Sequence, residues 1–101
     1  MNIVTFEDLD DSLFDAKHTI NRFHTGGCSG AKIAILSIST IFEYEENKHS
    51  VCDKKFVSIA IIDDQSDYDA FKNFGIDAWI KREEIGEING LLNLLEKRFL
   101  S

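Results

Sequence analysis

The apolar residues between residues 31 and 80 fall into short, dense runs separated by polar stretches. Residues 31–38 and 56–62 are nearly continuous apolar runs rich in β-branched side chains, typical of strands that are covered on both faces of a sheet. A shorter run at residues 76–80 indicates another strand. Between the last two runs, residues 67–74 predict a short helix that stops at Gly75, because glycine readily adopts the backbone conformation that ends a helix.

The final part of the chain has helical periodicity. From about residue 83 or 84, apolar side chains recur at spacings of three and four, which places them on one face of a helix. The residues of this stripe are Ile85, Ile88, Leu92, Leu95 and Phe99. Leu91 and Leu94 lie beside the stripe and widen the apolar face beyond what one packing surface needs.

The first thirty residues predict a strand followed by a helix. Residues 3–6 are a short β-favouring run. Apolar residues then recur from Leu9 to Phe23 at spacings of four, three, four and three, which predicts a helix with one buried face. Glycines between residues 25 and 30 end it. A weaker helical or irregular segment is expected at residues 41–47.

Strands alternating with helices predict an α/β fold. Right-handed crossovers place helices on both faces of a parallel sheet, which gives a three-layer sandwich. We count about four strands in this small sheet, flanked by helices. The length of 101 residues and the absence of a linker indicate a single domain over residues 1–101.

Composition and charge narrow the classes of partner. The formal net charge of −7 repels a phosphate backbone, so nucleic acid is not an expected partner. No apolar run approaches the roughly 20 residues that span a bilayer, which argues against a membrane protein. Two cysteines fit a reducing compartment, and we expect a cytoplasmic protein. The sequence indicates no cofactor and no catalytic triad.

The order of elements over residues 56–100 resembles the second half of a receiver domain of two-component response regulators. An apolar strand ends in acids, a short helix closes on Phe74 and Gly75, an apolar strand precedes a basic residue, and an amphipathic helix follows. Arg82 stands seven residues past Gly75, where the family pattern has lysine. The resemblance implies a flavodoxin-like fold, shortened here by the second strand–helix unit of the family.

The resemblance also implies roles for residues near the ends of the first strand and of the strand at residues 31–38. Receiver domains transfer a phosphoryl group from a histidine kinase to an aspartate, with the help of Mg²⁺ held by two acids after the first strand. Glu7 and Asp8 fit this acidic pair. The acceptor position falls at Ser37, whose neutral hydroxyl cannot form the acyl phosphate of this chemistry. Charge at the N-terminus of a helix is an equally good reason for the two acids.

Three more receiver positions lie in the resembling half of the chain. The family's hydroxyl residue falls near Ile62 or Asp63, and Arg82 replaces its lysine. Arginine keeps the charge but presents a planar fork, so it is not a geometric equivalent of lysine. Trp79 falls at the aromatic switch position, although an interfacial or buried tryptophan explains it as well.

These changes predict a degenerate receiver, or pseudo-receiver, with no enzymatic activity. Such a module acts through protein–protein interaction, and the expected partner is a histidine kinase or a neighbouring signalling domain, with a homodimer as another assembly. The expected interaction surface contains Trp79, Leu91 and Leu94. The alternative within the same family is an active, atypical receiver phosphorylated on an aspartate, for which Asp63 is the next candidate.

A different chemistry comes from two short histidine–cysteine pairs in the middle of the chain. His24 and Cys28 form the first pair, and His49 and Cys52 form the second. Four such ligands can hold zinc tetrahedrally. Their spacing matches no common zinc finger, so a small zinc-binding domain is the less favoured alternative.

Overall fold

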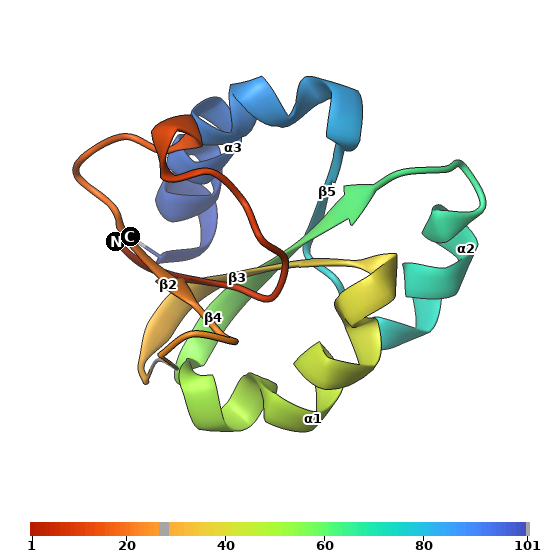
Figure 1. Ribbon diagram of the computed structural model, residues 1–101, viewed down its shortest axis with the longest axis horizontal. Coiled ribbons are helices and arrows are strands. Elements are labelled where there is room, and N and C mark those ends of the chain that lie inside the picture. Colours follow the sequence, from red (N-terminus) through yellow and green to blue (C-terminus); the bar gives the residue numbers. More distant parts are fainter. Residues whose placement is uncertain (27–28, 101) are drawn as a thin grey trace.

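Residues 1–26 and 29–100 are described by the structure, a computed structural model of the chain. Within them, five strands form one parallel sheet (Figure 1). In spatial order the strands are β2 (Thr19–Arg22), β1 (Asn2–Thr5), β3 (Ala31–Ser37), β4 (Cys52–Ile62) and β5 (Ala78–Lys81). This order is that of a flavodoxin-like α/β fold, which confirms the predicted fold class.

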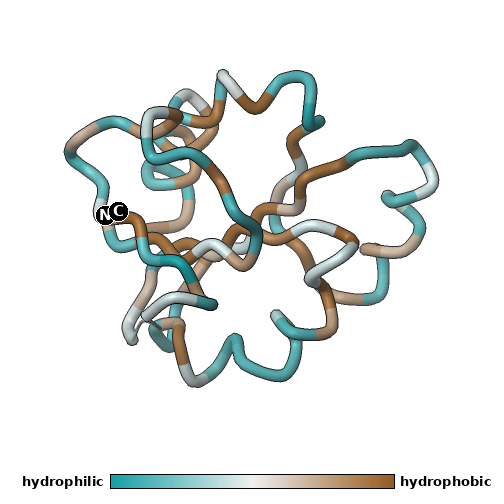
Figure 2. Tube along the Cα trace, in the orientation of Figure 1, coloured by the Kyte–Doolittle hydropathy of each residue, from teal (hydrophilic) through white to brown (hydrophobic). Residues whose placement is uncertain are grey.

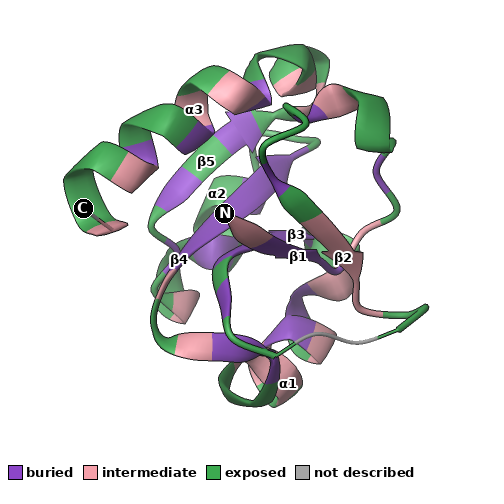
Figure 3. Ribbon diagram, turned by 90° about the vertical axis from the view of Figure 1, so that its left-hand side faces the viewer, coloured by how far each residue is buried: buried purple, intermediate pink, exposed green. Residues whose placement is uncertain are grey.

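Helices cover both faces of the sheet. Helices α1 (Ile41–Val51) and α2 (Asp67–Phe71) lie on one face, and α3 (Ile88–Leu95) lies on the other (Figure 1). Alternate strand residues point into one or the other of two buried clusters, so the strands are apolar on both sides (Figures 2 and 3). Shorter 3₁₀ segments are Asp11–Leu13, Ile38–Thr40, Lys72–Phe74 and Arg82–Glu87, and Glu96–Leu100 forms a π-type turn.

The prediction of a helix over residues 9–23 is wrong. A 3₁₀ turn, a connection that turns at residues 16 and 17, and strand β2 take its place. Leu9 is buried in the cluster beneath α3, where Leu13 and Ile20 also pack, whereas Phe23 packs against the cluster on the other face, so the spacing does not reflect one helical face. The segment contains three aspartates, one threonine and one asparagine, residue types that disfavour helix interiors. The chain instead pairs with the outer side of β1, where the Thr19 amide donates to the Met1 carbonyl at 2.8 Å.

The sheet therefore has five strands where the sequence indicated about four. The edge strand that the resemblance implied to be missing is present as β2, and the shortening affects its connection to β3. The described residues of that connection, 23–26 with 29 and 30, contain no helix. Phe23 stacks on Phe6 with ring centroids 4.8 Å apart, which covers part of the sheet face next to α1.

The other elements follow the sequence pattern, with two differences. The helix predicted from residue 83 or 84 is α-helical only over Ile88–Leu95, between a 3₁₀ and a π segment, and Phe99 of its apolar stripe is 41% exposed. Strand β4 begins earlier than predicted, and residues 53–56 bulge out of it, because Ala31 pairs with Cys52 while Ile33 already pairs with Val57. Gly75 has φ of 65° and ends the segment that follows α2, as predicted. None of the helices in the described part of the chain has the length and apolar character needed to cross a bilayer.

Candidate functional site

Four of the predicted site residues follow the carboxyl ends of four adjacent strands. Glu7 lies just beyond β1, Ser37 ends β3, Asp63 follows β4 and Arg82 follows β5. We call this end of the sheet the carboxyl edge, and the opposite end the amino edge. In open parallel sheets, ligands usually bind outside the carboxyl ends of the strands, where the strand order reverses. Here that point lies between β1 and β3.

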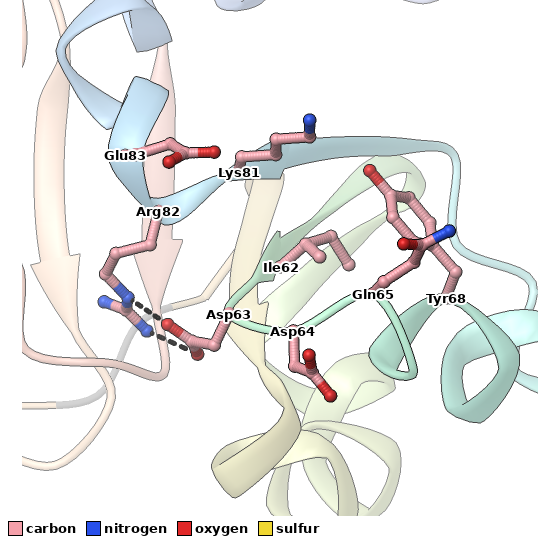
Figure 4. A pocket seen from close by; sticks show the side chains of 8 residues that line it. All are labelled: Ile62, Asp63, Asp64, Gln65, Tyr68, Lys81, Arg82 and Glu83. Atoms are coloured by element: carbon pink, nitrogen blue, oxygen red, sulfur yellow. Dashed lines mark hydrogen bonds and ion pairs between the residues drawn. The ribbon is translucent and has the colours of Figure 1, made fainter.

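The guanidinium group of Arg82, which follows β5, binds the acids that follow β1 and β4. It bonds Asp63 through two contacts, from Nε to Oδ1 at 2.5 Å and from Nη2 to Oδ2 at 3.0 Å (Figure 4). The same Nη2 atom donates to Oε1 of Glu7 at 2.6 Å. We call Glu7, Asp63 and Arg82 the arginine triad. It is the fork-shaped recognition of carboxylates for which arginine is suited.

Arg82 and the carboxylates that it binds stabilise each other's opposite charges. Hydrogen bonds from Arg82 hold the pKa of Asp63 below its ordinary value, and Asp63, followed by Glu7, raises the pKa of Arg82. The side chain of Glu7 is only 19% exposed, and its Oε2 atom is buried with no hydrogen-bond partner among the described residues. Arg82 therefore provides the counter-charge for a poorly solvated carboxylate.

Asp67 positions the loop that carries Asp63, and the sequence analysis did not identify it. Its side chain is buried, and Oδ2 accepts the backbone N–H groups of Asp63 at 3.0 Å and Asp64 at 3.1 Å. An aspartate at the start of a predicted helix, a few residues after a strand end, is a signal for such backbone contacts. The contact fixes the approach of Asp63 to Arg82.

The predicted acidic pair is divided between two arginines. Whereas Glu7 turns toward Arg82, the side chain of Asp8 is 95% exposed and contacts Nε of Arg22 at 3.3 Å. Arg22 also bonds Asp11 at 2.7 Å. The carboxylates of Glu7 and Asp8 thus do not converge on a shared cation position. Within residues 1–26 and 29–100, no group of three or more His, Cys, Asp or Glu side chains is placed to hold a metal ion.

Ser37 is fully buried at the end of β3. Its Oγ atom lies 3.0 Å from Oγ of Ser39, and its backbone N–H donates to Oγ1 of Thr40 at 2.9 Å. The hydroxyl therefore belongs to the turn that leads into α1. At this position a hydroxyl cannot supply the carboxylate that an acyl phosphate requires.

A pocket of about 630 Å³ opens next to the triad, over the ends of β4 and β5 and not at the point between β1 and β3. Figure 4 shows Lys81, Gln65 and Tyr68 on the side of the pocket away from Arg82. The complete lining is Ile62, Asp63, Asp64, Gln65, Tyr68, Lys81, Arg82 and Glu83. The volume is within the range of small-molecule sites, but the mixture of acids and bases selects no charge class of ligand.

The predicted interaction residues lie on two faces of the molecule. Trp79 is 44% exposed on the face covered by α2, with its ring 6.4 Å from that of Tyr68. Leu94 is 50% exposed on α3, while Leu91 is partly buried against the core beneath that helix. Since α2 and α3 cover opposite faces of the sheet, Trp79 and Leu94 lie on either side of it.

The described members of the proposed zinc set are not gathered around one point. His24 contacts Glu43, near the start of α1, at 2.6 Å. His49 and Cys52 lie at the other end of that helix, and the six residue steps from Glu43 to His49 rise by roughly 9 Å. Cys28 lies outside the described residues.

Comparisons with protein-family models, with curated proteins and with solved structures found no match to this chain.

Proposed function

We propose that this chain is a cytoplasmic pseudo-receiver, a non-catalytic module that regulates a two-component or related bacterial signalling pathway by binding a protein partner. The observation that carries the proposal is the arginine triad at the carboxyl edge of a sheet with flavodoxin-like strand order. In receiver chemistry, the acids after the first strand and the base after the last strand act on a phosphoryl group. In this chain the corresponding side chains, Glu7 and Arg82, bond each other.

Two further features of the same edge oppose phosphoryl transfer. Ser37 offers a buried hydroxyl at the acceptor position, and its oxygen is engaged with Ser39. The alternative acceptor Asp63 is bound through both of its carboxylate oxygens to Arg82. A phosphoryl group on Asp63 would have to break that bidentate contact, which favours a non-catalytic role over the atypical active receiver.

A histidine kinase or a neighbouring signalling domain is the partner that this function implies. Exposed aromatic and aliphatic side chains supply the surface, since Trp79 lies beside Tyr68 and Leu94 stands out from α3. Aromatic residues of this kind provide much of the binding energy in protein interfaces. The docking role therefore needs no covalent chemistry at the carboxyl edge.

Incubation with acetyl phosphate and Mg²⁺, followed by phosphate-affinity gel electrophoresis, tests the proposal. The wild-type chain should give no acid-labile band, whereas an active receiver domain run in parallel should give one. A Mg²⁺-dependent band that Asp63→Asn removes would instead establish an active receiver. The double variant Ser37→Asp, Arg82→Lys returns both altered positions to the family pattern and should gain some label if it remains folded.

A further inference from the structure

Exposed charges are divided unequally between the two ends of the sheet. The carboxyl edge carries exposed acids on the loops after β1, β4 and β5, including Asp10, Asp64, Glu83 and Glu84. The amino edge carries exposed bases before β2, at the start of β4 and at the end of the chain. These are Lys17, Lys54, Lys55, Lys97 and Arg98, which outnumber the exposed acid Asp15 at the same edge, while Lys81 is an exposed base at the carboxyl edge. A chain with a net charge of −7 thus has one basic end.

The bulge in β4 builds the basic end. Residues 53–56 leave the sheet between the Cys52 and Val57 pairings, which projects Lys54 and Lys55 into solvent. Asp53, the acid of this bulge, is held by Lys32, and neither Lys54 nor Lys55 forms an ion pair within the described residues. Lys55 also lines a shallow pocket of about 210 Å³ with Met1, Lys32, Glu96 and Leu100.

Each end of the sheet also presents an exposed apolar side chain. At the carboxyl edge, Phe42 in the first turn of α1 is 74% exposed, and Ile38 lies one turn before it with 36% exposure. At the amino edge, Phe99 is 41% exposed next to Lys97 and Arg98. An exposed apolar side chain at an edge that carries charged residues is the usual composition of an interface centre and its rim.

We propose that a second copy of this chain docks head to tail, with the acidic carboxyl edge of one copy on the basic amino edge of the next. The two surfaces are complementary in charge, and each contributes an exposed phenylalanine. They lie at opposite ends of parallel strands, so one contact leaves an unused edge on each copy. Association of this heterologous kind continues into chains or rings and does not stop at a two-fold dimer. Trp79, on the face covered by α2, lies outside this contact.

Salt should affect this association in two opposite ways. At low salt, the net charge of −7 makes whole copies repel one another over long distances. At about 0.15 M salt the Debye length is about 8 Å, which screens the long-range repulsion but spares charges in contact. At a salt concentration of about 1 M, the attraction between charges in contact is screened as well. We therefore expect the greatest association at intermediate salt, whereas purely apolar aggregation should only increase with salt.

Sedimentation velocity over a concentration series, with two variants that each lose one edge, tests the proposal. The amino-blocked variant is Lys54→Gln, Lys55→Gln, and the carboxyl-blocked variant is Phe42→Ser, Glu83→Gln, Glu84→Gln. All five side chains are exposed, so the fold should persist, as circular dichroism can verify. Each variant alone should associate about three- to tenfold more weakly than the wild type, since rim contacts are individually modest.

The mixture of the two variants gives the sharpest outcome. The amino-blocked variant keeps its acidic edge and the carboxyl-blocked variant keeps its basic edge, so together they should form one intact contact and a one-to-one dimer that grows no further. Trp79→Ser should leave assembly unchanged. A wild-type chain that stays monomeric at every salt concentration, or a mixture that associates no better than its components, would overturn the proposal.

Discussion

The two ends of the sheet hold their charges in different ways. At the carboxyl edge, Arg82 and Arg22 each bind two carboxylates, so these charges tie the ends of different strands together. At the amino edge, Lys54 and Lys55 stand on a bulge and have no ion-pair partner among the described residues. Ion pairs therefore contribute to internal order at the carboxyl edge, beside the exposed acids of its loops, whereas the lysines of the bulge contribute little to internal order. The two ends are thus separable by mutation.

Removal of Arg82 should have the largest effect on stability. Arg82→Ala leaves Glu7 with a buried oxygen and no counter-charge, and we expect unfolding to become easier by about 2 kcal/mol. Arg82→Lys should lose less stability, because lysine keeps the positive charge. It should still lose some, because lysine cannot make the bidentate contact. Urea denaturation measures the difference. The matched change at the amino edge, Lys54→Gln, should stay within about 0.5 kcal/mol, and an equal loss at both edges would refute the comparison.

Asp67→Ala should have the next largest effect. The substitution leaves the backbone N–H groups of Asp63 and Asp64 without their acceptor, at a cost of about 1–2 kcal/mol. Asp69→Ala is the matched control on the same helix, because Asp69 is exposed and its Oδ1 atom forms a long ion pair, 3.6 Å, with Nζ of Lys72. Chemical denaturation of both variants checks the ranking. If Asp69→Ala were as damaging as Asp67→Ala, the assigned role of Asp67 would be wrong.

The stability that the carboxyl edge contributes should also decrease in acid. The folded-state pKa of Asp63 lies below its ordinary value, mainly through hydrogen bonds from Arg82. Its contribution to stability is thus present above about pH 4, the ordinary value, and disappears as the pH falls through the lower folded-state value. The gap in unfolding free energy between wild type and Arg82→Ala should shrink from pH 7 to pH 3. A gap that remains constant across this range would show that the ion pair adds nothing.

The sequence predicts most of the molecule after residue 30, because local patterns there coincide with the tertiary environment. Runs such as residues 31–37 are apolar on both sides since they lie between two layers of helices. Gly75 marks its turn through backbone geometry alone. The first thirty residues differ, since Ile20 and Arg22 lie in β2 only because β1 offers an unpaired side. That is a non-local cause, which periodicity along the chain cannot reveal.

The sequence predicted which residues lie at the candidate site, but not which of them contact one another. The resemblance identified Glu7, Asp63 and Arg82, yet their mutual bonding depends on the register of β4 with β5 and on the path of the chain beyond β1. It also placed Asp8 beside Glu7 in function, whereas consecutive side chains after a strand point to different sides and meet different arginines. Pairings of this kind need coordinates, because many acids in the sequence could have satisfied each arginine.

The smallest expected effect concerns Tyr44, a buried tyrosine of α1 that packs against Phe6 just beyond β1, and it appears at alkaline pH. Burial raises the pKa of Tyr44 to about 12, while its hydrogen bond with Ser58, itself bonded to Asp77, lowers it by less. The phenol thus binds its proton more tightly in the folded state, and its contribution to stability is complete below about pH 10 and is lost as the pH rises toward 12. Tyr44→Phe should cost under about 1 kcal/mol at pH 8, since only one hydrogen bond disappears. Between pH 10 and pH 11.5 the wild type should lose this advantage and become the less stable chain, as paired urea titrations can measure. A difference that stays the same from pH 8 to pH 11.5 would mean that the Tyr44 hydroxyl is already solvated in the folded state.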